Sequence, residues 1–145
     1  MIELADVHKR YRDGERDNHV LRGVSLSIAP GEVVALTGSS GSGKSTLLNL
    51  MGAMDQDYQG QVVVAGQDLQ RLGDRALSAF RNTTVSFVFQ HFHLLGHLPA
   101  LANVMMPAWF DDRAPVEAAR ERAISLLGRV GLGDRLDALP GQLSG

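Results

Sequence analysis

A glycine-rich segment at residues 38–46, with the sequence GSSGSGKST, constrains this chain more than any other feature. It fits the pattern G-x-x-x-x-G-K-S/T, in which a loop of backbone N–H groups cradles phosphate oxygens. The run Val33-Val34-Ala35-Leu36 before it predicts a parallel strand that is buried on both faces. Behind it, apolar residues recur at helical spacing, namely Leu47, Leu50, Met51 and Met54. Strand, loop and helix therefore come in the order that a phosphate-binding loop (P-loop) requires.

The residue types in this loop suit a nucleotide triphosphate with a divalent cation. Gly38, Gly41 and Gly43 allow backbone conformations that a Cβ would forbid, and the following helix adds a partial positive charge. Lys44 would place its ammonium among the β- and γ-phosphate oxygens, and the Ser45 hydroxyl would ligate Mg²⁺. The predicted nucleotide-binding residues of the loop are Gly38, Ser39, Ser40, Gly41, Ser42, Gly43, Lys44, Ser45 and Thr46. A flexible Gly/Ser linker would need neither the Gly-Lys-Ser order nor the flanking strand and helix.

Composition excludes several other classes of protein. The chain has 145 residues, 44% apolar and 21% charged, which predicts one globular domain with a core. A net charge of −2 offers no basic field for nucleic acid, and the lack of cysteine excludes disulfides and thiolate metal sites. Residues 1–6 lack the pattern of a signal peptide, and prolines and polar residues interrupt the apolar stretch 94–110. We therefore expect a protein of the cytosol or of the cytosolic face of a membrane.

The remaining pattern predicts an α/β fold in three parts. Besides residues 33–36, we expect strands at 2–7, 24–28, 62–64 and 85–89, a hairpin loop at 13–19, and helices at 74–81 and 115–131. The last helix has an apolar face made of Val116, Ala119, Ala123, Leu126, Leu127 and Val130. The predicted division is an antiparallel β region at 1–31, a P-loop core at 32–90 and a helical subdomain at 91–145.

Four further stretches resemble the nucleotide-binding subunit of ATP-binding-cassette (ABC) transporters, and the similarity runs over all 145 residues. Tyr11 looks like the aromatic residue that stacks on adenine. Residues 85–90 resemble the strand and glutamine of the Q-loop, and Asn103-Val104 resembles the motif that follows it. Residues 142–145 resemble the start of the LSGGQ signature. Two stretches, residues 47–52 and 80–82, are similar to the lipoprotein-releasing and macrolide-export subfamily.

The resemblance implies roles beyond those that the loop itself suggests. ATP and Mg²⁺ would be the cofactors, with Gln90 as a second metal ligand beside Ser45. Lys44 and Gln90 would be the only groups in the chain with a part in catalysis. Two copies would sandwich ATP, and membrane subunits of the transporter would dock on the Q-loop region. The protein would then lie at the inner face of the cell membrane.

One segment imitates a catalytic motif of this family. Residues 105–112 read as an apolar run followed by two acids, as in a Walker B strand. Pro107 would remove a hydrogen bond from a central strand, and the family places Walker B after the signature. We therefore reject Asp111 and Asp112 as catalytic groups. The Walker B acid, the glutamate after it and the switch histidine would lie beyond residue 145, so we expect an incomplete P-loop core that does not turn over ATP by itself.

Three functions stay open at this point. The first is the ATPase subunit of an exporter or a lipoprotein-release complex. The second is a nucleotide-binding partner of a cell-division membrane complex that does not hydrolyse ATP. The third is an ABC ATPase of DNA repair, which the missing basic patch disfavours.

Overall fold

The computed structural model describes residues 1–14, 16–110 and 115–143. Asp111 and Asp112, and the last two residues of the signature-like segment, lie outside the described residues. The chain forms two compact units, Met1–Ser86 and Phe87–Gly145, and each is described by itself. The three-part division of the chain stays a prediction.

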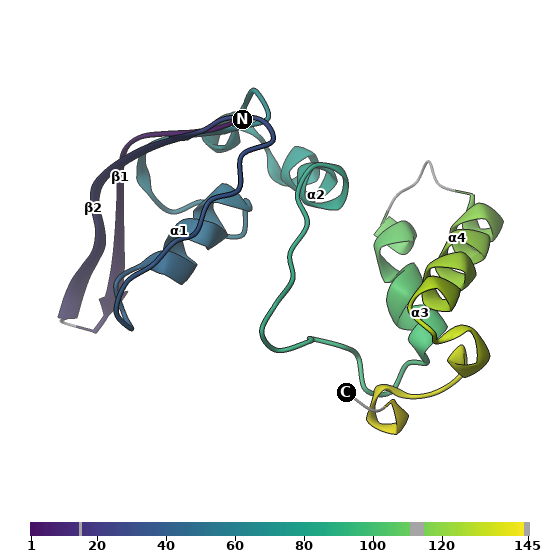
Figure 1. Ribbon diagram of the computed structural model, residues 1–145. Coiled ribbons are helices and arrows are strands. Elements are labelled where there is room, and N and C mark those ends of the chain that lie inside the picture. The colour runs from purple at the N-terminus through teal and green to yellow at the C-terminus, as the bar shows by residue number, and fades with distance from the viewer. Residues whose placement is uncertain (15, 111–114, 144–145) are drawn as a thin grey trace. The chain divides into compact units, whose positions relative to one another are not determined.

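The first unit is built on a four-stranded antiparallel sheet with the strand order β2-β1-β3-β4. The strands are β1 (Ile2–Asp13), β2 (Arg16–Ile28), β3 (Gln59–Val64) and β4 (Gln67–Asp68). Figure 1 shows β1 and β2 side by side as a long hairpin. The strands predicted at 2–7, 24–28 and 62–64 are confirmed. The hairpin loop predicted at 13–19 is wrong in length, because strand pairing continues until Asp13 lies opposite Arg16.

Helix α1 (Lys44–Met51) packs its apolar side against this sheet. The buried core joins side chains from the sheet with three from the helix: Leu4, Val7, Leu21, Val62, Leu47, Leu50 and Met51. Burial of each such aliphatic side chain contributes roughly 1.5–3 kcal/mol, so this face holds α1 in place. Met54 was predicted on the same face, but the helix ends at Met51 and Met54 is 51% exposed.

Helix α2 (Asp74–Thr83) completes the core of the first unit, and its prediction from the sequence is confirmed. A short 3-10 turn, η1 (Leu69–Arg71), precedes it. Leu77 and Phe80 on α2 are buried in the same apolar cluster as α1. The Arg81 guanidinium donates a hydrogen bond of 2.9 Å to the Ala53 carbonyl oxygen, which ties α2 to the turn after α1.

The prediction of strands at 33–36 and 85–89 is wrong for this structure. Neither segment has strand structure, and neither pairs with any of the four strands of the described residues. Val33 is 97% exposed and Val88 is fully exposed, whereas Leu36 and Val85 are partly buried against the core. The physical reason is that a strand exists only through hydrogen bonds to a neighbour, and apolar composition alone supplies none. The prediction of strands from these apolar runs therefore failed in both places, although one residue of each run packs on the core.

The second unit is helical. It contains α3 (Ala100–Met105) and α4 (Val116–Arg129), with the 3-10 turns η2 (Met106–Phe110), η3 (Gly133–Arg135) and η4 (Pro140–Gln142). Figure 1 shows α3 and α4 side by side. The helix predicted from Pro115 is confirmed, but its apolar face is narrower than predicted. Ala123 and Leu127 are buried, whereas Val116, Leu126 and Val130 are exposed.

Asn103 organises the segment that leads into α3. Its side-chain amide donates to the carbonyl oxygens of Leu95, Leu98 and Pro99 at 2.9–3.2 Å. Its side-chain oxygen accepts the Leu95 N–H at 2.8 Å. One side chain therefore ties together the backbone groups of the turn that leads into α3. Among the described residues, no helix combines the length and apolar character needed to cross a bilayer.

Candidate nucleotide-binding site

The glycine-rich loop lies in the first unit and leads directly into α1. Gly43 is the residue before the helix, and the Leu47 N–H donates to its carbonyl oxygen at 2.9 Å. Within the loop, the Ser42 N–H donates to the Ser39 carbonyl oxygen at 3.3 Å. The loop is thus a tight turn capped onto a helix N-terminus, where free N–H groups favour an anion.

Two glycines of the loop combine a positive φ with close side-chain neighbours. Gly43 has φ of 92°, and a Cβ there would lie 3.0 Å from Leu21 Cδ2 and 3.2 Å from Val20 Cγ1. Gly38 has φ of 148°, and a Cβ there would lie 2.9 Å from the Ser42 hydroxyl oxygen. Only glycine takes such conformations without strain, so the loop can approach β2 closely at one end and fold on itself at the other.

The Lys44 ammonium lies across the loop. It donates to the carbonyl oxygens of Gly38 and Ser39 at 2.9 and 2.7 Å and to the Ser42 hydroxyl at 3.3 Å. A positive charge held among loop backbone atoms is placed to meet an incoming anion. Ser45, the next residue, is exposed at the start of α1, so its hydroxyl is free to serve as a metal ligand. These donors fit a phosphate with Mg²⁺.

Tyr11 lies on β1 in the same unit, and its side chain is 41% exposed. The β1–β2 hairpin that carries it is also the surface on which Gly43 packs, through Val20 and Leu21 of β2. The structure thus places the aromatic ring and the phosphate loop on one hairpin. An exposed ring on a rigid strand is a suitable platform for a nucleobase.

Two residues that the sequence reasoning missed contact Tyr11 directly. The Lys9 ammonium lies over the Tyr11 ring, 4.8 Å from its centroid, and an Asp55 carboxylate oxygen accepts the Tyr11 hydroxyl at 3.3 Å. Lys9 and Asp55 are also joined to each other at 2.9 Å. The sequence analysis assigned no role to Lys9 or to Asp55. The spacing of two residues between Lys9 and Tyr11 on one strand was the only local signal, and β1 has a register shift between Lys9 and Arg10.

The pKa values of this pair reflect their contact. Burial opposes the charge on Lys9, which is only 3% exposed, but hydrogen bonds and attraction from Asp55 and Asp57 outweigh it. The pKa of Lys9 therefore lies above its ordinary value of 10.5. Burial would likewise raise the pKa of Asp55, but the Lys9 and Tyr11 hydrogen bonds and the Asp57 N–H hold it below 3.8. Both groups are charged at neutral pH.

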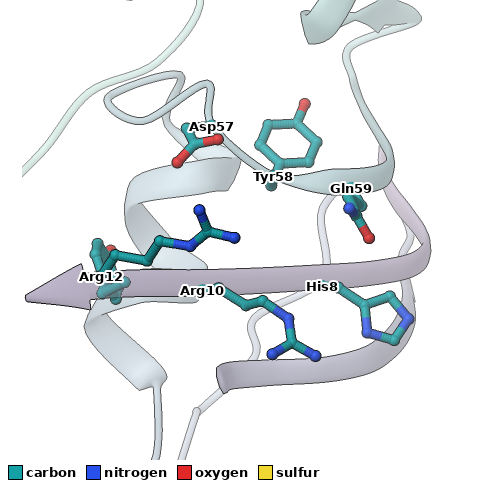
Figure 2. A pocket seen from close by; sticks show the side chains of 7 residues that line it. His8, Arg10, Arg12, Asp57, Tyr58 and Gln59 are labelled. Atoms are coloured by element: carbon teal, nitrogen blue, oxygen red, sulfur yellow. The ribbon is translucent and has the colours of Figure 1, made fainter. Parts of the chain in front are cut away.

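A polar hollow of about 590 Å³ lies on the same strand. Figure 2 shows that His8, Arg10 and Arg12 line it from β1. Asp57 and Tyr58 line it from the segment before β3, and Gln59 from the start of that strand. It contains none of the loop residues 38–46, and Tyr11 is its only residue predicted to bind nucleotide.

Tyr58, which lines this hollow, and His19, which contacts its lining residue His8, have shifted pKa values. Burial and the negative charge of Asp68 raise the pKa of Tyr58 to about 12. Lost hydration and the positive charge of Arg10 lower the pKa of His19, which stacks on His8. Tyr58 is therefore neutral at neutral pH, and His19 favours its neutral form.

Gln90, the predicted second metal ligand, belongs to the second unit. It is exposed and lies in a segment without regular secondary structure. Close by, the Phe89 ring packs on Phe87 and edge-on against His93. The predicted roles of Tyr11, Gln90 and the loop residues as ligands stay predictions.

Comparison with known proteins decides the family. Residues 21–145, most of the chain, match the protein family described as ABC transporter. The chain belongs to the ABC transporter family. This match also confirms the family inferred from the sequence motifs.

The relatives of this ABC transporter chain include ATP-binding proteins of two kinds. It is 48% identical over 145 residues to the lipoprotein-releasing system ATP-binding protein LolD of Geobacter metallireducens, and all of it aligns with 64% of that protein. It is also 48% identical to the macrolide export ATP-binding/permease protein MacB 1 of Aeromonas hydrophila subsp. hydrophila, of which it covers 22%. The chain thus spans less than two thirds of the length of these relatives.

Solved structures confirm the fold class of the ABC transporter chain. It superposes on the dimeric structure of a bacterial ABC transporter cassette with a TM-score of 0.87 and 39% identity, covering 100% of this chain and 64% of that one. A dimeric ATP-binding cassette in a post-hydrolysis state with ADP and phosphate gives a TM-score of 0.86 at 38% identity, covering 99% of this chain and 63% of that one. The predicted α/β P-loop architecture is therefore correct.

Proposed function

We propose that this chain is the ATP-binding part of a LolD- or MacB-type transporter, which couples ATP binding and hydrolysis to lipoprotein release or macrolide export. The observation that carries the proposal is the loop at 38–46, where Lys44 lies across a glycine turn capped onto α1. The similar cassette solved with ADP and phosphate supports a nucleotide as the ligand.

In this proposal, each residue has a physical task. Loop N–H groups and Lys44 hold the triphosphate, and Tyr11 stacks on the adenine ring. Ser45 and Gln90 would hold Mg²⁺, which when bound neutralises negative charge on the phosphates. Lys44 would exchange its carbonyl partners in the loop for phosphate oxygens, which are stronger acceptors because they are charged.

Partners follow from the family and from the exposed surface of the second unit. Two cassettes would sandwich ATP, as the dimeric state of the similar structures suggests. The segment 90–103 would dock a membrane subunit at the inner face of the cell membrane. Phe92 is 82% exposed there, and Leu94 and Leu95 are exposed as well, more apolar surface than a solvent loop requires. Leu98 and Leu101 are partly buried, so they support the helices and are not part of the docking surface.

The test of the proposed function is ATP binding by Lys44→Ala, measured by calorimetry with Mg²⁺ present. Loss of one charge-assisted hydrogen bond costs about 1.5–3 kcal/mol, so we expect affinity to fall at least tenfold. Arg81→Ala is a matched control, because it removes a cation of the same unit that binds the Ala53 carbonyl and not the loop. Equal ATP affinity in the wild type and Lys44→Ala would contradict the proposal.

A further inference from the structure

The contacts of Lys9 differ from those of an ordinary surface lysine. It is 3% exposed, yet its ammonium carries a full charge in the interior of the first unit. It bonds the Asp55 carboxylate at 2.9 Å, the Asp57 carboxylate at 3.3 Å and the Asp57 carbonyl oxygen. Burying a cation costs free energy unless such partners satisfy it, so we look for a role of the positive charge at this position.

The same ammonium also covers the Tyr11 ring. Its distance of 4.8 Å from the centroid is within the range of an attractive cation–π contact. Asp55 fixes the other end of the ring by accepting its hydroxyl hydrogen. The ring is therefore held at its face and at its hydroxyl, while 41% of the side chain stays open to solvent.

The partners of Lys9 connect the ring to the phosphate loop. Asp55 and Asp57 lie in the turn after α1, and the loop at 38–46 lies at the opposite end of that helix. Eight helical residues span about 12 Å. Lys9 is thus one of the contacts that join β1 to this turn, beside the apolar packing of α1 on the sheet. A bound nucleotide would have to bridge the distance between the Tyr11 ring and Lys44, from base to phosphates.

From these contacts we infer that Lys9, with Asp55, is a positioning residue for base stacking: it presents the Tyr11 ring at a fixed place relative to the phosphate loop. This inference rests on the proposed function, in which Tyr11 stacks on the base. It assigns Lys9 no contact with the nucleotide. We expect Lys9 to affect the affinity for ligands that carry a base and to leave the affinity for ligands that carry only phosphates unchanged.

The experiment compares two ligands, Mg·ATP and Mg²⁺ with inorganic triphosphate, on the 145-residue chain. The chain has only two lysines, Lys9 and Lys44, so Lys9→Met and Lys44→Met form a matched pair. We expect Lys9→Met to weaken ATP binding about three- to tenfold and to leave triphosphate binding within about twofold. Lys44→Met should weaken both ligands about tenfold or more.

If Lys9→Met lowers the affinity for ATP and for triphosphate equally, the role of Lys9 is only structural and the inference is overturned. Unchanged ATP affinity in Lys9→Met would overturn it as well. In a Tyr11→Ala background, Lys9→Met should have no further effect on ATP affinity, because the ring that it supports is gone. If Lys9→Met does not fold, Asp55→Asn takes its place with the same expectation for the two ligands. Failure of the proposed function looks different: Tyr11→Ala would then bind ATP like the wild type, whatever Lys9→Met does.

Discussion

Gly43 shows how closely the phosphate loop is fitted to the hairpin beneath it. A methyl group there would lie 3.0 Å from Leu21 and 3.2 Å from Val20, at a φ of 92° that side chains rarely adopt. We expect Gly43→Ala to lower the free energy of unfolding by about 1–3 kcal/mol, because alanine is strained at this φ and its methyl group would crowd both side chains. Chemical denaturation of the purified chain measures this change.

Gly128 supplies the control for that substitution. It lies within α4, and a Cβ there would meet nothing within 4 Å. Gly128→Ala should therefore raise the free energy of unfolding by about 0.4–1 kcal/mol, since alanine restricts the unfolded chain. The two glycine substitutions are expected to have opposite signs. A neutral Gly43→Ala would show that the loop does not need its close approach to β2.

At single positions, the sequence was most informative where chemistry is local. The glycines at 38 and 43 and the lysine at 44 follow from one contiguous pattern, and the structure gives both glycines a positive φ, as the pattern implies. Lys9 and Asp55 are 46 residues apart, and no local pattern joins them. Their pairing depends on the packing of β1 against the turn after α1, which is a tertiary property.

The same distinction explains which elements were predicted correctly. Helices α2 and α4 follow from spacing and end signals within each segment. The strands at 62–64 and 24–28 find partners in β1, which lies in the same sheet. Residues 33–36 and 85–89 have equally apolar sequences but no paired neighbour among the described residues. A strand depends on another segment for its hydrogen bonds, so its own composition is insufficient.

The connection between β1 and the turn after α1 predicts a dependence of stability on pH. The pKa of Asp55 is lower in the folded chain than its ordinary 3.8, so its carboxylate stabilises the fold above that value. As the pH falls below 3.8 toward the folded-state pKa, this stabilisation is lost. We expect Asp55→Asn to cost about 1.5–3 kcal/mol at pH 6 and progressively less below pH 3.8. Urea denaturation at a series of pH values gives the difference between variant and wild type.

Asp57→Asn is the control for this dependence. Its carboxylate also faces Lys9, but the side chain is 94% exposed, and its backbone carbonyl keeps its own bond to Lys9. Solvent screens exposed ion pairs, so Asp57→Asn should change stability by less than Asp55→Asn at pH 6. Equal and pH-independent effects of the two substitutions would argue that Asp55 contributes no charge to the fold.

The hydrogen bonds of the Asn103 side chain predict that its substitution will destabilise the segment before α3. Asn103→Ala removes the acceptor of the Leu95 N–H and the donor for three carbonyl oxygens. We expect a loss of about 1–3 kcal/mol and faster hydrogen exchange at the Leu95 amide, because that N–H loses its partner. Val104→Ala, one residue along the same helix, should leave that exchange rate unchanged. Slow exchange at Leu95 in Asn103→Ala would show that another group orders the segment.

In the whole chain, the predicted tasks are divided between the two units. The phosphate loop, Tyr11 and its support by Lys9 and Asp55 all belong to Met1–Ser86. Gln90 and the exposed apolar segment after it belong to Phe87–Gly145. Residues proposed to bind base and phosphates are thus in one unit, and residues proposed for coupling are in the other. Nucleotide binding is therefore expected to depend mainly on the first unit.

This division leads to the expectation that the 145-residue chain binds ATP without hydrolysing it. Hydrolysis needs a group that positions or deprotonates the attacking water, in addition to the phosphate cradle and Mg²⁺. None of the ion pairs among the described residues involves Lys44, and Asp55 is already held by Lys9.

In a steady-state phosphate-release assay, the chain and its Lys44→Ala variant should give the same background rate. The full-length LolD of Geobacter metallireducens serves as the comparison protein, because this chain aligns with 64% of it. Phosphate release that disappears in Lys44→Ala would contradict this expectation and would return attention to Asp111 and Asp112.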